Sequence, residues 1–331
     1  MIELLAQNMG EDFQVAEFES LIEKRNAQFI EPFWQKQVTS DNIFGKQQVR
    51  IAYAYVINPE PVGSIAISSG RIESLLKYKE LVFNLYHAGF SVFIHDHRGQ
   101  GLSGRMLEDP EKGYVDDFAD YVADFKLFYD QVIAPKTKQK PILLSHSMGA
   151  AIASLYLLTH PDDFAKCIMS APMFGVRPAL PKWFSCLLIE GYLALNRFFG
   201  KSPWYFIGQT KYKPKAFEVN ELTHCRQRYK IFRDIYEANP QCKLGGVTTT
   251  WLKQADKAMT YIQKNAAKIT TPILLIQAGQ DSVVNNTKQT QVAWKMLNCK
   301  VLHIENAKHE IFLESEEIRD QSLRAILRFL A

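Results

Sequence analysis

Short apolar runs alternate with longer amphipathic stretches from about residue 50 onward. The short runs are rich in β-branched and aromatic residues and predict strands at 49–56, 63–68, 90–98, 141–147 and 164–172. Between them, apolar residues recur at helical spacing, as in 116–133, and another such stretch ends at Gly89. This alternation predicts a mostly parallel sheet with helices on both faces, which is an α/β fold.

The alternation stops between residues 174 and 268, where aromatic residues, Lys and Arg are frequent and no strand is predicted. It resumes with a strand at 271–281, a helix, a strand at 300–309 and a final helix at 313–330. We therefore expect residues 174–268 to form a helical cap, or lid, inserted between two strands. The α/β core would then consist of a first part, residues 1–173, and a second part, residues 269–331.

Composition places the chain among folded globular proteins, since 47% of its 331 residues are hydrophobic and 22% are charged. The five cysteines contain no C-x-x-C pair, so we expect neither a metal site nor a cofactor, and we expect reduced thiols in the cytoplasm. The first residues, MIELLAQNMG, lack the basic and apolar segments of a secretion signal. Polar residues interrupt the longest apolar stretch, 183–199, so it is not expected to span a membrane.

The sequence SHSMG at 145–149 indicates chemistry because it interrupts an apolar run between a strand and a helix. A sharp turn there would lift Ser147 above the sheet edge, and such a turn needs small residues two positions before and after the serine. Those positions hold Ser145 and Gly149, a variant of the usual G-x-S-x-G. Alternatively, Ser147 simply caps the helix that begins at Met148, because serine is a favoured N-cap.

Asp281 and His309 favour a catalytic interpretation of Ser147. Each follows a predicted strand, and the chain order Ser, Asp, His is that of α/β-hydrolases. An imidazole can take the proton of a serine hydroxyl, and a carboxylate can fix the tautomer of that imidazole. The backbone N–H groups of Met148 and Arg71 are expected to form the oxyanion hole.

Other polar residues near these motifs are expected to have structural roles. His146 should turn its side chain away from Ser147 and pack. Asp96 and Arg98 should brace a tight glycine-rich loop near the mouth of the site. Ser103 is a rival nucleophile, but an arginine stands two positions after it, where a sharp turn needs a small residue.

Six motifs carry a resemblance to a known family: SGRIESLLKYKEL at 69–81, DHRGQGLSGR at 96–105, SHSMGAAIA at 145–153, LGGVTTTWL at 244–252, AGQDSVV at 278–284 and AKHEIFLE at 307–314. With them the chain resembles the monoacylglycerol lipase and lysophospholipase group of α/β-hydrolases, and within it the bacterial lysophospholipase L2 family. The resemblance implies hydrolysis of the acyl ester of a lysophospholipid. The chain departs from the family pattern at Ser145 and at Ser69, where a histidine often stands.

Three alternatives remain open at this point. The same chemistry could act on monoacylglycerols or on general carboxylic esters. The protein could be an aminopeptidase of the same fold, although the shortage of acids in the cap argues against capture of a free amino terminus. It could also bind lipids without catalysis, which the complete set of Ser147, Asp281 and His309 disfavours.

The predicted cap is basic, with 16 Lys and Arg against 6 Asp and Glu, a net charge of +10, which leaves 4 − 10 = −6 on the rest of the chain. Its apolar stripe, including Trp183 and Phe184, is a candidate acyl-binding surface, and Arg226 and Arg228 are candidates for binding a phosphate. The stripe could instead pack on the core, and the basic run could be a solvated helix face. We expect peripheral contact with anionic membranes from the cytoplasm, no nucleic-acid partner and no obligate protein partner.

Overall fold

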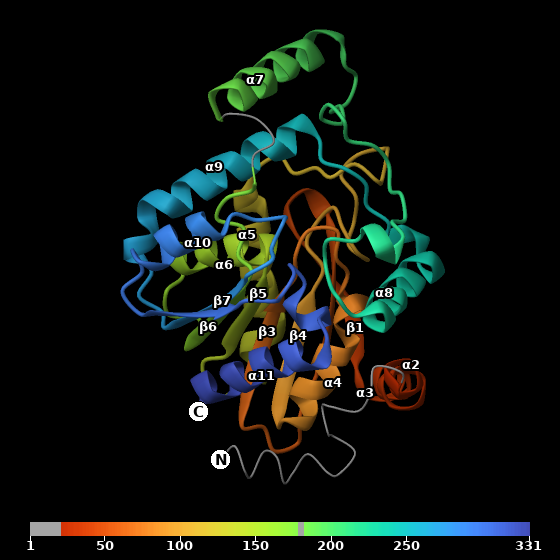
Figure 1. Ribbon diagram of the computed structural model, residues 1–331, viewed down its shortest axis with the longest axis vertical. Helices are drawn as coiled ribbons and strands as arrows, with labels where there is room; N and C mark the ends of the chain where they lie inside the picture. Colours follow the sequence, from red (N-terminus) through yellow and green to blue (C-terminus); the bar gives the residue numbers. More distant parts are fainter. Residues whose placement is uncertain (1–20, 178–181) are drawn as a thin grey trace.

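A single eight-stranded sheet forms the centre of the computed structural model, which describes residues 21–177 and 182–331 (Figure 1). Its order is β1-β2-β4-β3-β5-β6-β7-β8. The strands are β1 (Thr39–Phe44), β2 (Arg50–Val56), β3 (Gly63–Ser68), β4 (Phe90–His95), β5 (Ile142–His146), β6 (Lys166–Ser170), β7 (Ile273–Ala278) and β8 (Cys299–Ile304). The pairs β1–β2 and β2–β4 are antiparallel and the others parallel. The predicted mostly parallel sheet of an α/β fold is confirmed.

Helices cover both faces of this sheet. Outside the segment between β6 and β7, the helices are α2 (Ile22–Arg25), α3 (Glu31–Gln37), α4 (Lys79–His87), α5 (Phe118–Phe128), α6 (Met148–Thr159), α10 (Asn286–Ala293) and α11 (Glu316–Leu330), of which α2 and α3 lie at the side of the sheet. Right-handed connections place α4 on one face and α5, α6 and α10 on the other, and α4 and α11 lie together in front of the sheet in Figure 1. The central strands are consequently buried on both sides, and the side chains of Ile65 on β3 and Leu144 on β5 are 0% exposed.

The strand order reverses between β3 and β5. Chain direction leads from β3 to β4 on one side and then back across β3 to β5 on the other. In an open parallel sheet, such a reversal leaves a crevice beyond the carboxyl ends of the two strands, where ligands bind. The loop after β3, residues 69–74, and the turn after β5 both lie at this point.

The segment between β6 and β7 holds three longer helices, α7 (Lys182–Phe199), α8 (Arg226–Ala238) and α9 (Thr249–Asn265). Its described residues add no strand to the sheet. Helix α9 packs on α5 and α6, α7 packs on α9 and projects beyond it, and α8 contacts α2 at the side of the sheet (Figure 1). Within the described ranges, no helix has the length and apolar character needed to cross a bilayer.

Candidate active site

Ser147, Asp281 and His309 meet at the carboxyl edge of the sheet. Ser147 follows β5, Asp281 follows β7 and His309 follows β8. The His309 Nε2 atom lies 3.0 Å from Ser147 Oγ, and His309 Nδ1 lies 2.7 Å from Asp281 Oδ2. All three side chains are buried, with Ser147 the most accessible at 7%. This geometry allows a proton to pass from the hydroxyl to the ring, while the carboxylate orients that ring.

The turn that carries Ser147 is strained and tightly packed. Ser147 has φ +51° and ψ −116°, a conformation that non-glycine residues adopt at a cost of about 1–3 kcal/mol. A Cβ at Gly149 would lie 2.2 Å from the Ser68 carbonyl oxygen, so no larger residue fits there. Ser145, which replaces the usual first glycine, donates a hydrogen bond from its Oγ to the Ile168 carbonyl at 2.9 Å. The variant residue is therefore accommodated within the sheet.

Asp281 is held ionised by its surroundings. Its Oδ1 accepts hydrogen bonds from the Val283 and Val284 amides at 2.8 and 2.9 Å, which leaves Oδ2 for His309. Burial by itself would raise the pKa of Asp281. The hydrogen bond and charge of His309 and the two amides outweigh burial and bring this pKa below its usual range. A carboxylate that stays charged can stabilise an imidazolium beside it.

The β3 loop and the start of α6 provide two candidate oxyanion donors. Among the described residues, the amides of Arg71 and Met148 form no hydrogen bond with any other group. Met148 is buried, and free buried amides are rare in folded proteins. Ile72 has φ +61°, which is unusual for a β-branched residue and marks strain in this loop. The hydroxyl of Tyr236 on α8 donates to the Ile72 carbonyl at 2.6 Å, and the Arg71 guanidinium donates to the Gly245 carbonyl at 2.8 Å. The segment between β6 and β7 thus holds the loop in place.

Ser147 and His309 open onto a cavity of about 610 Å³, which we call the Ser147 cavity. Its lining contains six Lys and Arg residues and three Glu residues: Arg71, Lys77, Lys211, Lys213, Lys215, Arg233, Glu73, Glu221 and Glu310. Lys77 pairs with both Glu73 and Glu310, and Lys215 pairs with Glu221. The other four cations have no carboxylate within 4.0 Å among the described residues; they are Arg71, Lys211, Lys213 and Arg233. The cavity is therefore suited to an anionic ligand.

Comparison with known families agrees with this site. A family model described as serine aminopeptidase, S33, matches residues 59–316, which is most of the chain. The chain belongs to this family. Within it, lysophospholipase L2 of Escherichia coli is 37% identical over 272 residues, covering 80% of this chain and 79% of that protein. The probable lysophospholipase L2 of Haemophilus influenzae is 33% identical over 301 residues, covering 90% of this chain and 94% of that protein.

A solved structure shows the same fold at lower identity. The monoacylglycerol lipase of Paleococcus ferrophilus superposes with a TM-score of 0.65 at 20% identity, over 89% of this chain and 98% of that one. This likeness shows the fold, and the S33 match with the two L2 relatives confirms the family that the motifs predicted.

Sequence reasoning missed a buried charged cluster in this S33 family member, formed by Glu73, Lys77, His146 and Glu310. Lys77 bridges both glutamates, and the Glu73 carboxylate also accepts from the Tyr78 hydroxyl at 2.5 Å and from the Gly70 amide. Burial opposes charge on Lys77, but Glu310 and Glu73 outweigh it and raise the pKa of Lys77. The cluster thus ties the β3 loop to the residue next to His309. In the sequence, the i, i+4 spacing of Glu73 and Lys77 is the signal that could have indicated an ion pair here.

His146 faces this cluster rather than a purely apolar environment. Its Nδ1 lies 3.2 Å from the Ser170 carbonyl, its Nε2 lies 3.4 Å from Glu310 Oε2, and its ring centroid is 4.9 Å from that of His309. Burial would lower the pKa of His146, but Glu310 and Glu73 outweigh burial and raise it. Glu73, His146 and Glu310 also place three possible metal-ligand atoms within 4.8 Å of one another. Because the Lys77 ammonium already bridges the two carboxylates, the cluster has its own cation.

None of the four predicted substrate-binding residues is among the described residues that line the Ser147 cavity. Trp183 and Phe184 are on α7, and Trp183 is 71% exposed. Arg226 begins α8, lies exposed over the Phe217 ring and pairs with Glu218 at 2.7 Å. The structure does not bring these residues to the candidate nucleophile.

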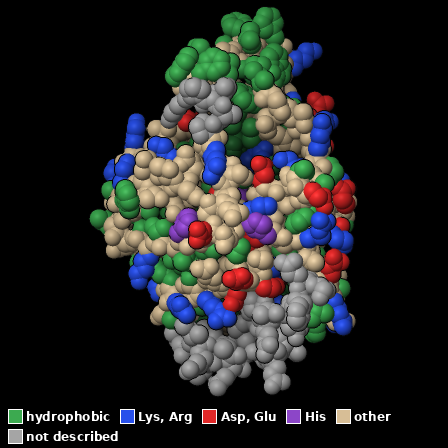
Figure 2. All heavy atoms as spheres, in the orientation of Figure 1, with side chains coloured by type: hydrophobic (Ala, Val, Ile, Leu, Met, Phe, Trp, Pro, Cys, Tyr) green, Lys and Arg blue, Asp and Glu red, His purple; other side chains and the backbone are tan. Residues whose placement is uncertain are grey.

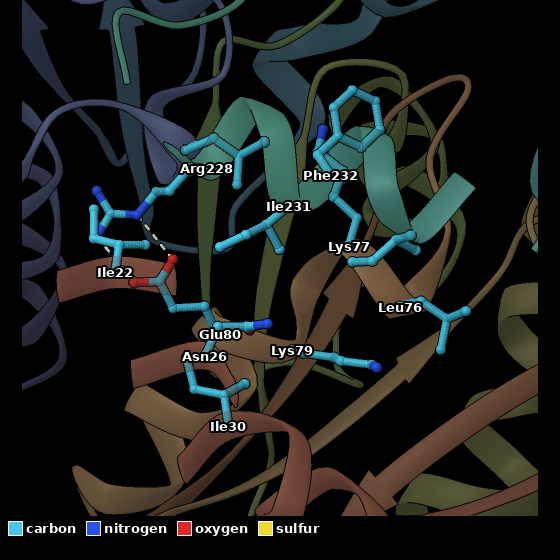
Figure 3. Close-up of a pocket in the computed structure, with 12 residues that line it drawn as sticks. Ile22, Asn26, Ile30, Leu76, Lys77, Lys79, Glu80, Arg228, Ile231 and Phe232 are labelled. Carbon is cyan, nitrogen blue, oxygen red and sulfur yellow. Dashed lines mark hydrogen bonds and ion pairs between the residues drawn. The ribbon is translucent and has the colours of Figure 1, made fainter. Parts of the chain in front are cut away.

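Arg228 was predicted to face a substrate phosphate, but its guanidinium is buried and pairs with protein carboxylates (Figure 3). It donates to both carboxylate oxygens of Glu80, at 2.8 and 2.9 Å, to the Glu314 carbonyl at 2.7 Å, and to Glu316. Burial opposes ionisation of Glu80, but Arg228 and Arg319 lower its pKa to about 2. Arg228 is therefore paired with protein carboxylates and joins α8 to the core.

Proposed function

We propose that this protein hydrolyses the acyl ester of lysophospholipids, with Ser147 as nucleophile, His309 as general base and acid, and Asp281 as the residue that orients His309. The observation that carries the proposal is the continuous hydrogen-bonded chain from Ser147 to His309 to Asp281 at the wall of a cationic cavity. The protein is a carboxylic ester hydrolase of the S33 family, and its L2 relatives are named as lysophospholipases.

The reaction follows from this arrangement. Ser147 Oγ attacks the ester carbonyl carbon while its proton moves to His309 Nε2, and the amides of Arg71 and Met148 are proposed to stabilise the oxyanion. The glycerol oxygen then leaves as an alcohol with the proton from His309, and the acyl group remains on Ser147. Water attacks this acyl-enzyme, gives its proton to His309, and releases the fatty acid with Ser147 reprotonated.

The cavity charge favours a lysophospholipid over the second candidate, a monoacylglycerol. A lysophospholipid carries a phosphate, whereas a monoacylglycerol is uncharged. Four cations in the cavity lining lack a described carboxylate partner, and a neutral substrate would leave their charge unbalanced. An aminopeptidase role is disfavoured because each glutamate of the lining already pairs with a lysine, Glu73 and Glu310 with Lys77 and Glu221 with Lys215.

A substrate panel tests the proposed function. Purified protein is given a lysophospholipid, a monoacylglycerol with the same acyl chain, and an amino-acyl amide, and the released fatty acid and amine are quantified. We expect the largest kcat/KM for the lysophospholipid and no release of amine. A larger kcat/KM for the monoacylglycerol would support the second candidate, and release of amine alone would contradict ester hydrolysis.

We further propose that α7 contacts anionic membranes. Its large apolar side chains are solvent-exposed, at 71% for Trp183, 63% for Leu187, 84% for Phe198 and 75% for Phe199. Apolar side chains gather at the end of the molecule where α7 projects (Figures 1 and 2). An amphipathic helix that exposes such residues beside Lys and Arg can lie in the membrane interface.

Vesicle binding tests this surface with a matched pair of tryptophans. Trp183→Ser is expected to weaken co-sedimentation with anionic vesicles about tenfold, because it removes a large apolar group from the interface. Trp294→Ser is the control, since Trp294 is 82% exposed but lies just after α10. Binding of the wild-type protein should also weaken with salt. Equal effects of the two substitutions, or binding that ignores salt and anionic lipid, would count against contact through α7.

A further inference from the structure

Arg233, in the middle of α8, is a cation of the Ser147 cavity whose guanidinium is held by two tyrosine hydroxyls and two aromatic rings rather than by a carboxylate. It donates to the Tyr229 hydroxyl at 2.7 Å and to the Tyr212 hydroxyl at 3.3 Å. Its Cζ atom lies 4.7 Å from the ring centroids of both Tyr229 and Phe232. Within the described part of the chain, its buried Nε has no hydrogen-bond partner.

These contacts orient the guanidinium but do not neutralise it. Stacking on aromatic rings and hydrogen bonds to hydroxyls hold a planar guanidinium in one orientation, which reduces the entropy lost when a ligand binds. The Tyr229 hydroxyl donates its own proton to the Lys215 carbonyl at 2.9 Å, so that hydroxyl is free to accept from Arg233. A fixed guanidinium that retains its charge is suited to pair with phosphate oxygens.

Two lysines extend the same surface. Lys211 and Lys213 flank Tyr212 in the chain, line the cavity and are exposed. In the described structure neither has a carboxylate within ion-pair distance. Tyr212 itself is fixed through its amide, which donates to Glu111 at 2.6 Å. Arg233, Lys211 and Lys213 therefore provide three positive charges on one wall of the cavity that also contains Ser147 and His309.

We propose that Arg233, supported by Lys211 and Lys213, binds the phosphate of the substrate while Ser147 attacks the acyl ester. The inference rests on the proposed function and names the residues that would make the enzyme select a phospholipid substrate. The ester and the phosphate of a lysophospholipid are joined through glycerol, so both groups must fit one site. A cavity of about 610 Å³ is of the size that holds small-molecule ligands.

The decisive measurement is the ratio of kcat/KM for a lysophospholipid to kcat/KM for a monoacylglycerol with the same acyl chain, in one detergent mixture. Arg233→Met is expected to lower this ratio about 10- to 100-fold, as for the loss of a charge-assisted hydrogen bond. Arg233→Lys should lower this ratio less, because the positive charge is kept and only the paired N–H donors of the guanidinium are lost. Lys230→Met is the control: Lys230 lies on the same helix, pairs with Asp234 and Glu23, and is expected to leave the ratio unchanged.

A second readout uses sn-glycerol 3-phosphate as a probe and does not depend on lysophospholipid turnover. It should bind the wild-type protein in calorimetric titration and compete with monoacylglycerol hydrolysis, and Arg233→Met and Arg233→Lys should both bind it more weakly. Absence of binding to the folded wild-type protein would overturn the proposal, as would an unchanged ratio in both Arg233 variants or an equal drop in Lys230→Met. Failure of the proposed function is distinguishable, because the wild-type protein then does not prefer the lysophospholipid as a substrate, whether or not the probe binds through Arg233.

Discussion

Ser147→Ala is expected to lower kcat/KM for lysophospholipid hydrolysis by about 10⁴-fold or more while the protein stays folded. The hydroxyl is the atom proposed to form the acyl-enzyme, so its removal leaves only binding and oxyanion stabilisation. Alanine fits the turn after β5 as well as serine does, because both carry a Cβ at φ +51°. The change is measured from steady-state rates, and folding from the thermal unfolding midpoint.

Fluorophosphonate labelling provides the control for this prediction. The wild-type protein should be labelled at Ser147, and Ser147→Ala should lose the label. Ser103→Ala should keep it, because the Ser103 hydroxyl is already engaged: it donates to the Asp96 carbonyl at 2.7 Å and accepts from the Ala52 amide at 2.9 Å. Full activity in Ser147→Ala, or labelling at another serine, would exclude the proposed mechanism.

The sequence was sufficient to predict the fold because strands buried on both faces must be almost wholly apolar. The strand predicted at 63–68 is present with those bounds as β3, and the breaks after β5, β7 and β8 are where polar side chains can leave the sheet. Strand β1 was not predicted, because a strand at the edge of the sheet does not need to be apolar. Its sequence TSDNIF lies at an edge with only Ile43 buried, so no apolar pattern marks it.

The charged cluster and the role of Arg228 could not be predicted from the sequence, because both depend on contacts between distant segments. Arg228 and Glu80 are 148 residues apart, and nothing in the basic run 224–233 distinguishes an arginine paired in the core from one that faces the cavity. Arg233 belongs to the same run and lines the cavity. Helical spacing places residues on faces of a helix, but the partner of each face is set by tertiary packing.

The same limit explains His146. Its position beside Ser147 predicted a side chain that turns away, and the ring does contact the Ser170 carbonyl on the neighbouring strand. Its other nitrogen faces Glu310, which follows His309 in the chain. Because residues 146 and 310 lie far apart in the chain, the sequence does not indicate this contact. Two residues that each adjoin a member of the proposed triad in the chain are thereby linked to each other in the lining of the Ser147 cavity.

Asp281→Asn is expected to lower kcat by about 10⁴-fold, approaching the effect of removing the nucleophile. The amide oxygen can still accept from the Val283 and Val284 amides, so the loop keeps its shape. The amide nitrogen then faces His309 Nδ1 as a donor, and the ring must carry its proton on Nε2. An Nε2–H group cannot take the proton of Ser147, which lies 3.0 Å away. Steady-state kcat at neutral pH measures the loss.

A double substitution shows whether Asp281 acts through His309 and Ser147 or only stabilises the fold. Because the three groups are proposed to work as one unit, Ser147→Ala combined with Asp281→Asn should be no slower than Ser147→Ala alone. Asp162→Asn is the surface control, since its side chain is 92% exposed, and it should leave kcat unchanged. If the two losses multiplied instead, Asp281 would act independently of the nucleophile, and the carboxylate would have to be assigned a role outside proton transfer.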